Sequence, residues 1–200
     1  MQILDTVMLA TRNAHKLREF ERLLAPAQIS VRALPDGIEL PPEVGATFAG
    51  NARPKAQAAA AATGEMTIAD DSGIEAETLG GRPGVRSARY AGPDAGDEQN
   101  LAKLEREVPA GSALRYVCAL VLVDPSSQGA GERLFVGECR GQMAPRRSGE
   151  RGFGYDPVFL PAGVSPPRTM AELSDAEKDR ISHRGRAVQA LLTWARGDGG

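Results

Sequence analysis

Two adjacent carboxylates, Asp70 and Asp71, stand in the segment "IADDSG", directly after an apolar stretch that favours a β-strand. A pair of carboxylates at the end of a strand suits Mg²⁺, which takes one or two protein carboxylates and keeps several waters. One of the two acids can instead orient or deprotonate a water molecule. The alternative is a plain turn, because Asp, Ser and Gly are the commonest turn-forming residues.

A second candidate is the segment "TRNAHK", which follows a short apolar run and opens a helix-like segment. Such a turn presents backbone N–H groups and the positive end of a helix, and both favour a phosphate. Lys16 adds a cation and Asn13 an amide donor. Alternatively, Asn13 only caps the helix and Lys16 lies in solvent. The chain contains neither GxGxxG nor GxxxxGK[ST], so neither a Rossmann nor a Walker nucleotide site is supported.

Two further candidate segments, "GFGYDP" and "SHRG", lie in the second half of the chain. In the first, glycines allow close backbone approach and an aromatic ring can stack on a nucleobase. Alternatively, Phe153 and Tyr155 are core residues at a glycine-rich turn. In the second, Ser182 is a candidate N-cap for a last helix whose first turn holds His183 and Arg184. An Arg fork matches phosphate or carbonyl oxygens, although such a pair can also be an ordinary surface feature. Together, the four segments predict a metal-assisted nucleotide enzyme.

The elements that position these segments alternate between strands and helices, which predicts an α/β or α+β sheet protein. We expect strands over 6–10, 66–70, 113–124 and 132–143, and helices over 13–24, 97–108 and 186–196. An alanine-rich helix stops at Gly64. If it begins near Thr47, Pro54 lies inside it and kinks it; if Asn51 is the cap, Pro54 is tolerated in the first turn. We expect one or the other, and Ser72–Gly73 to end the strand that carries the two acids.

Length and composition bound the function class. The 200 residues, with 42% hydrophobic and 25% charged residues, indicate one globular domain, at most with two lobes. A net charge of -2 disfavours a duplex nucleic-acid partner. No run approaches the ~20 apolar residues of a membrane span, and the first residues lack a basic segment before an apolar core, so we expect a cytoplasmic protein with no membrane partner. Cys118 and Cys139 are expected to be reduced, buried thiols rather than a cross-strand disulfide.

The order of several longer segments resembles one known family. "TRNAHKLREF", "ATFAGNARPKA", "IADDSGIEAETLGGRPGVRSARYAG", "GFGYDPVF" and "AELSDAEKDRISHRGRA" occur as in the HAM1/RdgB-like non-canonical purine nucleoside triphosphate pyrophosphatases, from about Val7 to Ala195. The resemblance implies a mixed α/β (α+β) fold that is elongated and two-lobed, with a central mixed β-sheet flanked by helices and a cleft between the lobes. It also implies a single domain over 1–200, for which we expect a disordered tail at 197–200, and a homodimer.

The same resemblance implies a function. Members hydrolyse dITP, ITP and XTP to the monophosphate and pyrophosphate with Mg²⁺, which keeps these nucleotides out of DNA and RNA. Two other functions stay open on the sequence: a Maf-type nucleotide pyrophosphatase that acts on other bases, and a nucleotide-binding protein without catalysis.

Roles follow from the resemblance position by position. Asp71 matches the general base, which is also a metal ligand, and Glu43 matches a metal-site carboxylate. Asp70 is expected beside Asp71 in the metal shell, and the sequence does not separate a division of the two roles from their exchange or sharing. The positions that match substrate-binding residues are Thr11, Arg12, Asn13, Ala14, His15, Lys16, Lys55, Ser72, Phe153, Gly154, Tyr155, Asp156, Lys178, His183 and Arg184.

The chain departs from the family pattern at three positions. Gly50 stands where many members have Glu, so any metal or water contact of that Glu is absent or supplied elsewhere. Pro54 precedes Lys55 and can re-aim it, and Arg12 replaces a common Gly in the first turn.

Overall fold

The computed structural model describes residues 4–127 and 131–197, which form two compact units. The first unit comprises Met1–Asp71, Cys118–Gly137 and Arg186–Gly200, and the second comprises Ser72–Val117 and Glu138–Gly185. One six-stranded sheet has the strand order β2-β1-β3-β4-β5-β6. It contains parallel pairs, β1 with β2 and β3, and an antiparallel pair, β5 with β6. The predicted mixed α/β class with a central mixed sheet is therefore confirmed.

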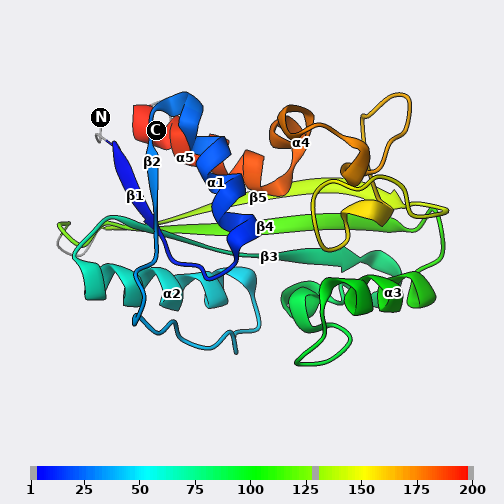
Figure 1. Ribbon diagram of the computed structural model, residues 1–200, viewed down its shortest axis with the longest axis horizontal. Helices are drawn as coiled ribbons and strands as arrows, with labels where there is room; N and C mark the ends of the chain where they lie inside the picture. Colours follow the sequence, from blue (N-terminus) through cyan, green and yellow to red (C-terminus); the bar gives the residue numbers. More distant parts are fainter. Residues whose placement is uncertain (1–3, 128–130, 198–200) are drawn as a thin grey trace. The chain divides into compact units, whose positions relative to one another are not determined.

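The elements follow the order shown in Figure 1. The strands are β1 (Thr6–Leu9), β2 (Ser30–Ala33), β3 (Thr67–Ala76), β4 (Ala113–Val123), β5 (Glu132–Met143) and β6 (Phe159–Pro161). The helices are α1 (Ala14–Leu24), α2 (Phe48–Thr63), α3 (Asp97–Glu107), α4 (Asp175–Ile181) and α5 (His183–Arg196).

In the first unit, β1 lies between β2 and β3, and all three strands are parallel. The chain leaves β1 through α1 to reach β2 on one side, and then passes through α2 to reach β3 on the other side. Because parallel crossovers are right-handed, this reversal places the two helices on opposite faces of the strands. Figure 1 shows this arrangement, with α1 and α5 on one face and α2 on the other.

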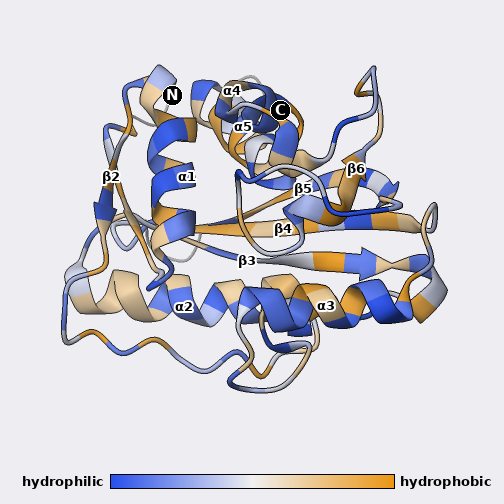
Figure 2. Ribbon diagram, turned by 45° about the vertical axis from the view of Figure 1, so that its right-hand side comes forward, coloured by the Kyte–Doolittle hydropathy of each residue, from blue (hydrophilic) through white to orange (hydrophobic). Residues whose placement is uncertain are grey.

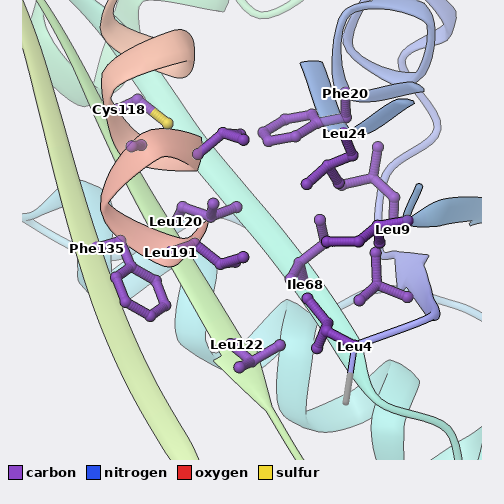
Figure 3. Close-up of a cluster of buried hydrophobic side chains, with 14 residues drawn as sticks. Leu4, Leu9, Phe20, Leu24, Ile68, Cys118, Leu120, Leu122, Phe135 and Leu191 are labelled. Atoms are coloured by element: carbon purple, nitrogen blue, oxygen red, sulfur yellow. The ribbon is translucent and has the colours of Figure 1, made fainter. Parts of the chain in front are cut away.

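Side chains of the first unit alternate between these faces, as the period of a strand requires. Leu9 of β1 and Ile68 of β3 pack in one cluster with Phe20 of α1. Figure 3 shows this cluster, in which α5 also takes part. The adjacent residues in these strands, Met8 before Leu9 and Ala69 after Ile68, belong to a second cluster with the alanines of α2. Consecutive residues of β3 therefore face different helices.

The second unit has a core of its own. Leu101 and Leu104 of α3 pack there with Tyr116 of β4, and the cluster extends to Met170 and Leu173 near the start of α4. Figure 2 shows hydrophobic residues along much of β4, a strand buried at most of its positions. Capping boxes at Thr169–Glu172 and Ser174–Glu177 begin the last 3₁₀ turn before α4 and α4 itself.

One of the two alternatives for α2 is confirmed, and one expectation about β3 is wrong. Helix α2 begins at Phe48 with Thr47 as its N-cap, so Pro54 lies inside the helix and the late start at Asn51 does not occur; the kink at Pro54 stays a prediction. Strand β3 does not end at Ser72–Gly73 but continues to Ala76. The reason is burial, because Ile74 and Ala76 enter the core of the second unit. Packing of these side chains outweighs the turn preference of the Asp-Ser-Gly residues.

Other expectations are met. Asn13 caps α1, Gly64 ends α2 in the left-handed conformation, and Cys118 and Cys139 are buried thiols. Across the described residues, no helix combines the length and the apolar character that crossing a membrane would need. Residues 198–200 of the expected C-terminal tail lie outside the described residues.

Candidate functional site

Asp71 is the centre of an acidic cluster in the first unit, whose members are Glu43, Asp70 and Asp71. Its side chain is 4% exposed, and Oδ2 accepts a 2.8 Å hydrogen bond from Nδ2 of Asn51 in α2. Burial, followed by the nearby negative charge of Glu43, raises the pKa of Asp71 from 3.8 to about 6, against the opposing effects of Asn51, Lys16 and Lys55. A carboxylate with such a pKa can accept a proton near neutral pH.

Glu43 is held beside Asp71 by two contacts of its loop. Nζ of Lys55 lies 2.6 Å from Oε1 of Glu43 and donates a second bond of 2.8 Å to the backbone oxygen of Asp70. The backbone N–H of Gly45 donates a 2.7 Å bond to Oδ1 of Asn51. Asn51 therefore ties both the Glu43 loop and the Asp71 carboxylate to α2.

Asp70 faces the other helix. Its side chain is fully buried, and Oδ1 lies 3.0 Å from Nζ of Lys16 in α1. Since β3 continues through both acids, strand alternation directs Asp70 to the face of Ile68 and Asp71 to the face of Ala69. The strand-end explanation for a shared site of both acids is therefore wrong, and a role of Asp70 in the metal shell stays a prediction.

The topology of the first unit explains why these residues gather. Leu9, the last residue of β1, is in register with Ile68, so β3 extends past the carboxyl end of β1. The turn before α1 and the two acids lie at this end of the parallel strands, where the chain leaves β1 towards β2 on one side while β3 lies on the other side. Such a switch point is where open α/β sheets bind ligands.

The turn before α1 is held by hydrogen bonds between its own residues. Oδ1 of Asn13 accepts from the amides of His15 (2.8 Å) and Lys16 (3.2 Å), and Oγ1 of Thr11 accepts from the amide of Asn13. Arg12 donates three 2.8 Å bonds to carbonyl oxygens of the loop at 34–38. The capping role of Asn13 is thus confirmed, while phosphate binding by this turn, Ala14 included, stays a prediction.

The acidic cluster fits Mg²⁺ by the chemistry of its donors. Among the described residues, no group of three or more His, Cys, Asp or Glu side chains is arranged to hold a metal ion. Mg²⁺, however, is commonly bound by one or two carboxylates, with water and substrate phosphates as the other ligands. Glu43 and Asp71, two hard oxygen donors close enough to raise the pKa of Asp71, match that pattern.

A second cluster, in the second unit, is built around Asp156. The Asp156 side chain is 4% exposed, and its carboxylate accepts from Nζ of Lys178 (2.8 Å), the amide of Phe153 (3.0 Å) and the hydroxyl of Tyr116 (3.1 Å). A Cβ at Gly152 would lie 2.0 Å from Oδ2 of Asp156, so glycine is required there. Asp156 therefore fixes the shape of the "GFGYDP" loop and the position of Lys178.

Phe153 is the aromatic ring of this loop that stays partly exposed. Nζ of Lys178 and Cζ of Arg184 lie 5.2 Å and 5.3 Å from its ring centroid. Tyr155, by contrast, is buried in the core and donates its hydroxyl to the Ser87 carbonyl. The base-stacking prediction is therefore left to Phe153. The amide of Gly154 donates to Asp97 at the start of α3.

His183 and Arg184 open helix α5, as predicted. Oγ of Ser182 accepts a 3.0 Å bond from the amide of Gly185, which caps the helix. Arg184 donates a 2.6 Å bond to Oγ of Ser72. Arg184 and Ser72 both belong to the second unit.

Sequence reasoning missed two residues of these clusters, Asn51 and Tyr116. A signal existed for Asn51, since Asn is a poor residue for a helix interior unless its side chain is used elsewhere. Tyr116 stood in a strand of apolar residues and looked like core. Its hydroxyl was the signal, because a buried hydroxyl requires a partner.

Known proteins resemble the chain over nearly all of its length. The family model described as the Ham1 family matches residues 7–194. A dITP/XTP pyrophosphatase from Frankia alni is 48% identical, over 95% of this chain and 96% of that protein. One from Geobacillus kaustophilus is 46% identical, over 92% and 91%. A HAM1 protein from Coxiella burnetii has a solved structure that is 35% identical, covers 98% of this chain and 100% of that chain, and aligns with a TM-score of 0.83. The chain therefore belongs to the Ham1 family.

Proposed function

We propose that this chain is a nucleoside triphosphate pyrophosphohydrolase that converts the non-canonical purine nucleotides dITP, ITP and XTP to the monophosphate and pyrophosphate. Family membership and the names of the dITP/XTP pyrophosphatase relatives support the substrate class. The observation that carries the chemistry is the buried Asp71, whose pKa of about 6 suits a base near neutral pH.

In the proposed reaction, Asp71 accepts a proton from a water molecule as the water oxygen bonds to the α-phosphorus. The bond from that phosphorus to the bridging oxygen breaks, and pyrophosphate leaves with the electron pair. Asn51 holds Oδ2 of Asp71, which fixes the direction in which the carboxylate meets the water. Removing a proton as the bond forms lowers the barrier because the water becomes a stronger nucleophile.

The triphosphate carries several negative charges, so the proposal needs cations near it. Lys16 and Lys55 supply two, and both already contact oxygens of the acidic cluster. We propose that Glu43 and Asp71 hold Mg²⁺, which when bound would neutralise charge on the phosphates. Asp70 would then act as the counter-ion that positions Lys16.

The Asp156 cluster is proposed to bind the nucleobase. Phe153 offers a partly exposed ring for stacking, and Lys178, His183 and Arg184 offer N–H donors for the keto oxygen of hypoxanthine or xanthine. An adenine amino group would leave such donors without acceptors, which is a costly mismatch in a buried site. This difference is the proposed basis for rejecting dATP.

A pyrophosphate-release screen over dITP, XTP, dATP, dTTP and UTP with Mg²⁺ tests the function. Fast release from dITP and XTP is expected, and Asp71→Asn should abolish it. Preference for dTTP and UTP would instead indicate a Maf-type activity. Nucleotide binding without release from any substrate would indicate a non-catalytic binding protein. The homodimer and the cytoplasmic location stay predictions; light scattering tests the dimer.

A further inference from the structure

The ring of Tyr116 contacts two residues of the Asp156 cluster at once. Its face is stacked on the imidazole of His183, with centroids 4.6 Å apart and an interplanar angle of 6°. Its hydroxyl donates a 3.1 Å hydrogen bond to Oδ1 of Asp156. Tyr116 and His183 are 6% and 4% exposed, so both contacts are shielded from water.

The tyrosine hydroxyl is chemically suited to this position. Burial and the neighbouring Asp156 carboxylate hold the pKa of Tyr116 well above its usual value. The hydroxyl therefore stays protonated near neutral pH and donates to Asp156. A phenylalanine would fill the same core space, in which the ring centroids of Tyr116 and Phe159 lie 4.7 Å apart. It would, however, leave Oδ1 of Asp156 without this donor.

Asp156 in turn positions the groups that are proposed to contact the nucleobase. Its other oxygen, Oδ2, accepts from Nζ of Lys178 and from the amide of Phe153. The hydroxyl of Tyr116 thus orients the carboxylate that holds Lys178 and the Phe153 loop. The face of the same ring sets the plane of His183, which comes from a different element, α5.

We propose that Tyr116 is a positioning residue that sets purine specificity, by fixing His183 relative to Lys178 and Phe153. This inference rests on the proposed nucleobase role of the Asp156 cluster. Because Tyr116 acts through other residues, its loss should weaken base recognition more than phosphate hydrolysis.

The first test is kinetic and uses Tyr116→Phe, which keeps the stacked ring and removes only the hydroxyl. KM for dITP should rise roughly threefold to tenfold, with kcat changed less than about twofold, and the ratio of kcat/KM for dITP over dATP should fall. Tyr90→Phe is the matched control, since it also removes one tyrosine hydroxyl, which contacts Glu107 instead of Asp156. An unchanged KM and dITP/dATP ratio in Tyr116→Phe would overturn the proposal.

The second test needs no activity and reads the stacking directly. The chain has two histidines, so a ¹H–¹³C spectrum of its imidazole groups contains two sets of signals, and His15→Gln assigns them. The His183 protons should be shifted upfield by the Tyr116 ring current, keep that shift in Tyr116→Phe and lose it in Tyr116→Leu. Leu104→Ala, which weakens the same core without removing the ring, should keep it. A His183 signal that does not move in folded Tyr116→Leu would overturn the stacking.

The two tests separate this inference from the proposed function. If the wild-type protein releases no pyrophosphate from any purine triphosphate, the proposed function fails, and the specificity role of Tyr116 fails with it. If wild type prefers dITP and Tyr116→Phe matches it in KM and in dITP/dATP discrimination, only the inference on Tyr116 fails.

Discussion

The side-chain amide of Asn51 in α2 donates a 2.8 Å hydrogen bond to Oδ2 of Asp71 in β3. The oxygen of the same amide accepts from the backbone of Gly45, two residues beyond Glu43. One buried amide therefore sets the position of the proposed base and of the loop that carries its partner acid. Asn51 is 3% exposed, so both hydrogen bonds are buried.

We expect Asn51→Ala to lower kcat at least about tenfold, because a shift of the base by a fraction of an ångström is enough to slow a positioned reaction. The free energy of unfolding should also fall by about 1–3 kcal/mol, since two buried partners lose their hydrogen bonds. Pyrophosphate release and urea denaturation measure the two effects.

The matched control is Asn100→Ala. Asn100 is also buried and its side chain also bonds to backbone groups, but in the second unit around α3. It should lose similar stability while kcat for dITP stays close to wild type. Equal losses of kcat in both variants would show that Asn51 acts through stability alone.

The raised pKa of Asp71 makes the stability of the metal-free protein depend on pH. The pKa is about 6 in the folded state and 3.8 without the fold, so the folded state binds the proton more tightly. The stabilisation is fully present below pH 3.8 and is lost as pH rises through about 6. The free energy of unfolding of the wild type minus that of Asp71→Asn should therefore fall by on the order of 2 kcal/mol between about pH 4 and pH 7.5.

Urea denaturation in EDTA at both pH values measures this difference. Carboxylates that do not interact with Asp71 titrate alike in both proteins and cancel in the subtraction, so the difference reports on Asp71 together with its coupling to Glu43. If the two proteins lose stability in parallel over this range, the burial of Asp71 does not raise its pKa as the structure indicates.

Glu43 supplies the second carboxylate of the proposed magnesium site. We expect Glu43→Gln to raise the Mg²⁺ concentration for half-maximal pyrophosphate release about tenfold or more, because an amide oxygen is neutral and attracts the ion less strongly. Binding of Mn²⁺, followed by electron paramagnetic resonance, should weaken in the same proportion. Glu39→Gln removes an exposed acid of the same loop region and should leave both measurements unchanged.

Much of the fold could be predicted from local patterns. The helix at 14–24 follows from the spacing of Leu17, Phe20 and Leu24 and from the Asn13 cap, and the two capping boxes locate the last 3₁₀ turn before α4 and the start of α4 itself. The sequence predicts an end of β3 at Ser72–Gly73, which is too early, because Asp, Ser and Gly carry strong turn preferences. Its continuation depends on burial of Ile74 by residues distant in the sequence, which no local pattern contains.

The candidate site, like the fold, could be predicted from the sequence only in part. Residue types alone pointed to Asp71, Lys16, Phe153 and Arg184 as chemistry-bearing groups. They did not reveal that Asp70 and Asp71 face different helices, because that depends on whether the strand continues. The roles of Asn51 and Tyr116 were hidden for a related reason, since each is defined by a partner at least 20 residues away in the chain.

The first turn of α2 offers a prediction about the Gly50 departure. Oγ1 of Thr47 accepts a 3.0 Å bond from the amide of Gly50, which is half of a capping box; a Glu at this position supplies the other half by accepting from the Thr47 amide. We expect Gly50→Glu to raise the free energy of unfolding by about 1 kcal/mol, through higher helix propensity and the added bond. A Cβ here lies 3.0 Å from Oγ1 of Thr47, so this hydroxyl must move by a few tenths of an ångström.

Gly50→Ala separates the two contributions, because it adds the Cβ and the helix propensity without the carboxylate. Thermal and urea denaturation of both variants should place Gly50→Glu above Gly50→Ala, and Gly50→Ala near or above wild type. If Gly50→Ala falls well below wild type, the hydroxyl of Thr47 cannot give way, and glycine at this position protects the cap. Activity adds a second distinction: kcat that rises in Gly50→Glu beyond the effect of Gly50→Ala would mean that the carboxylate also serves the acidic cluster, whereas equal kcat values would confine its effect to the helix.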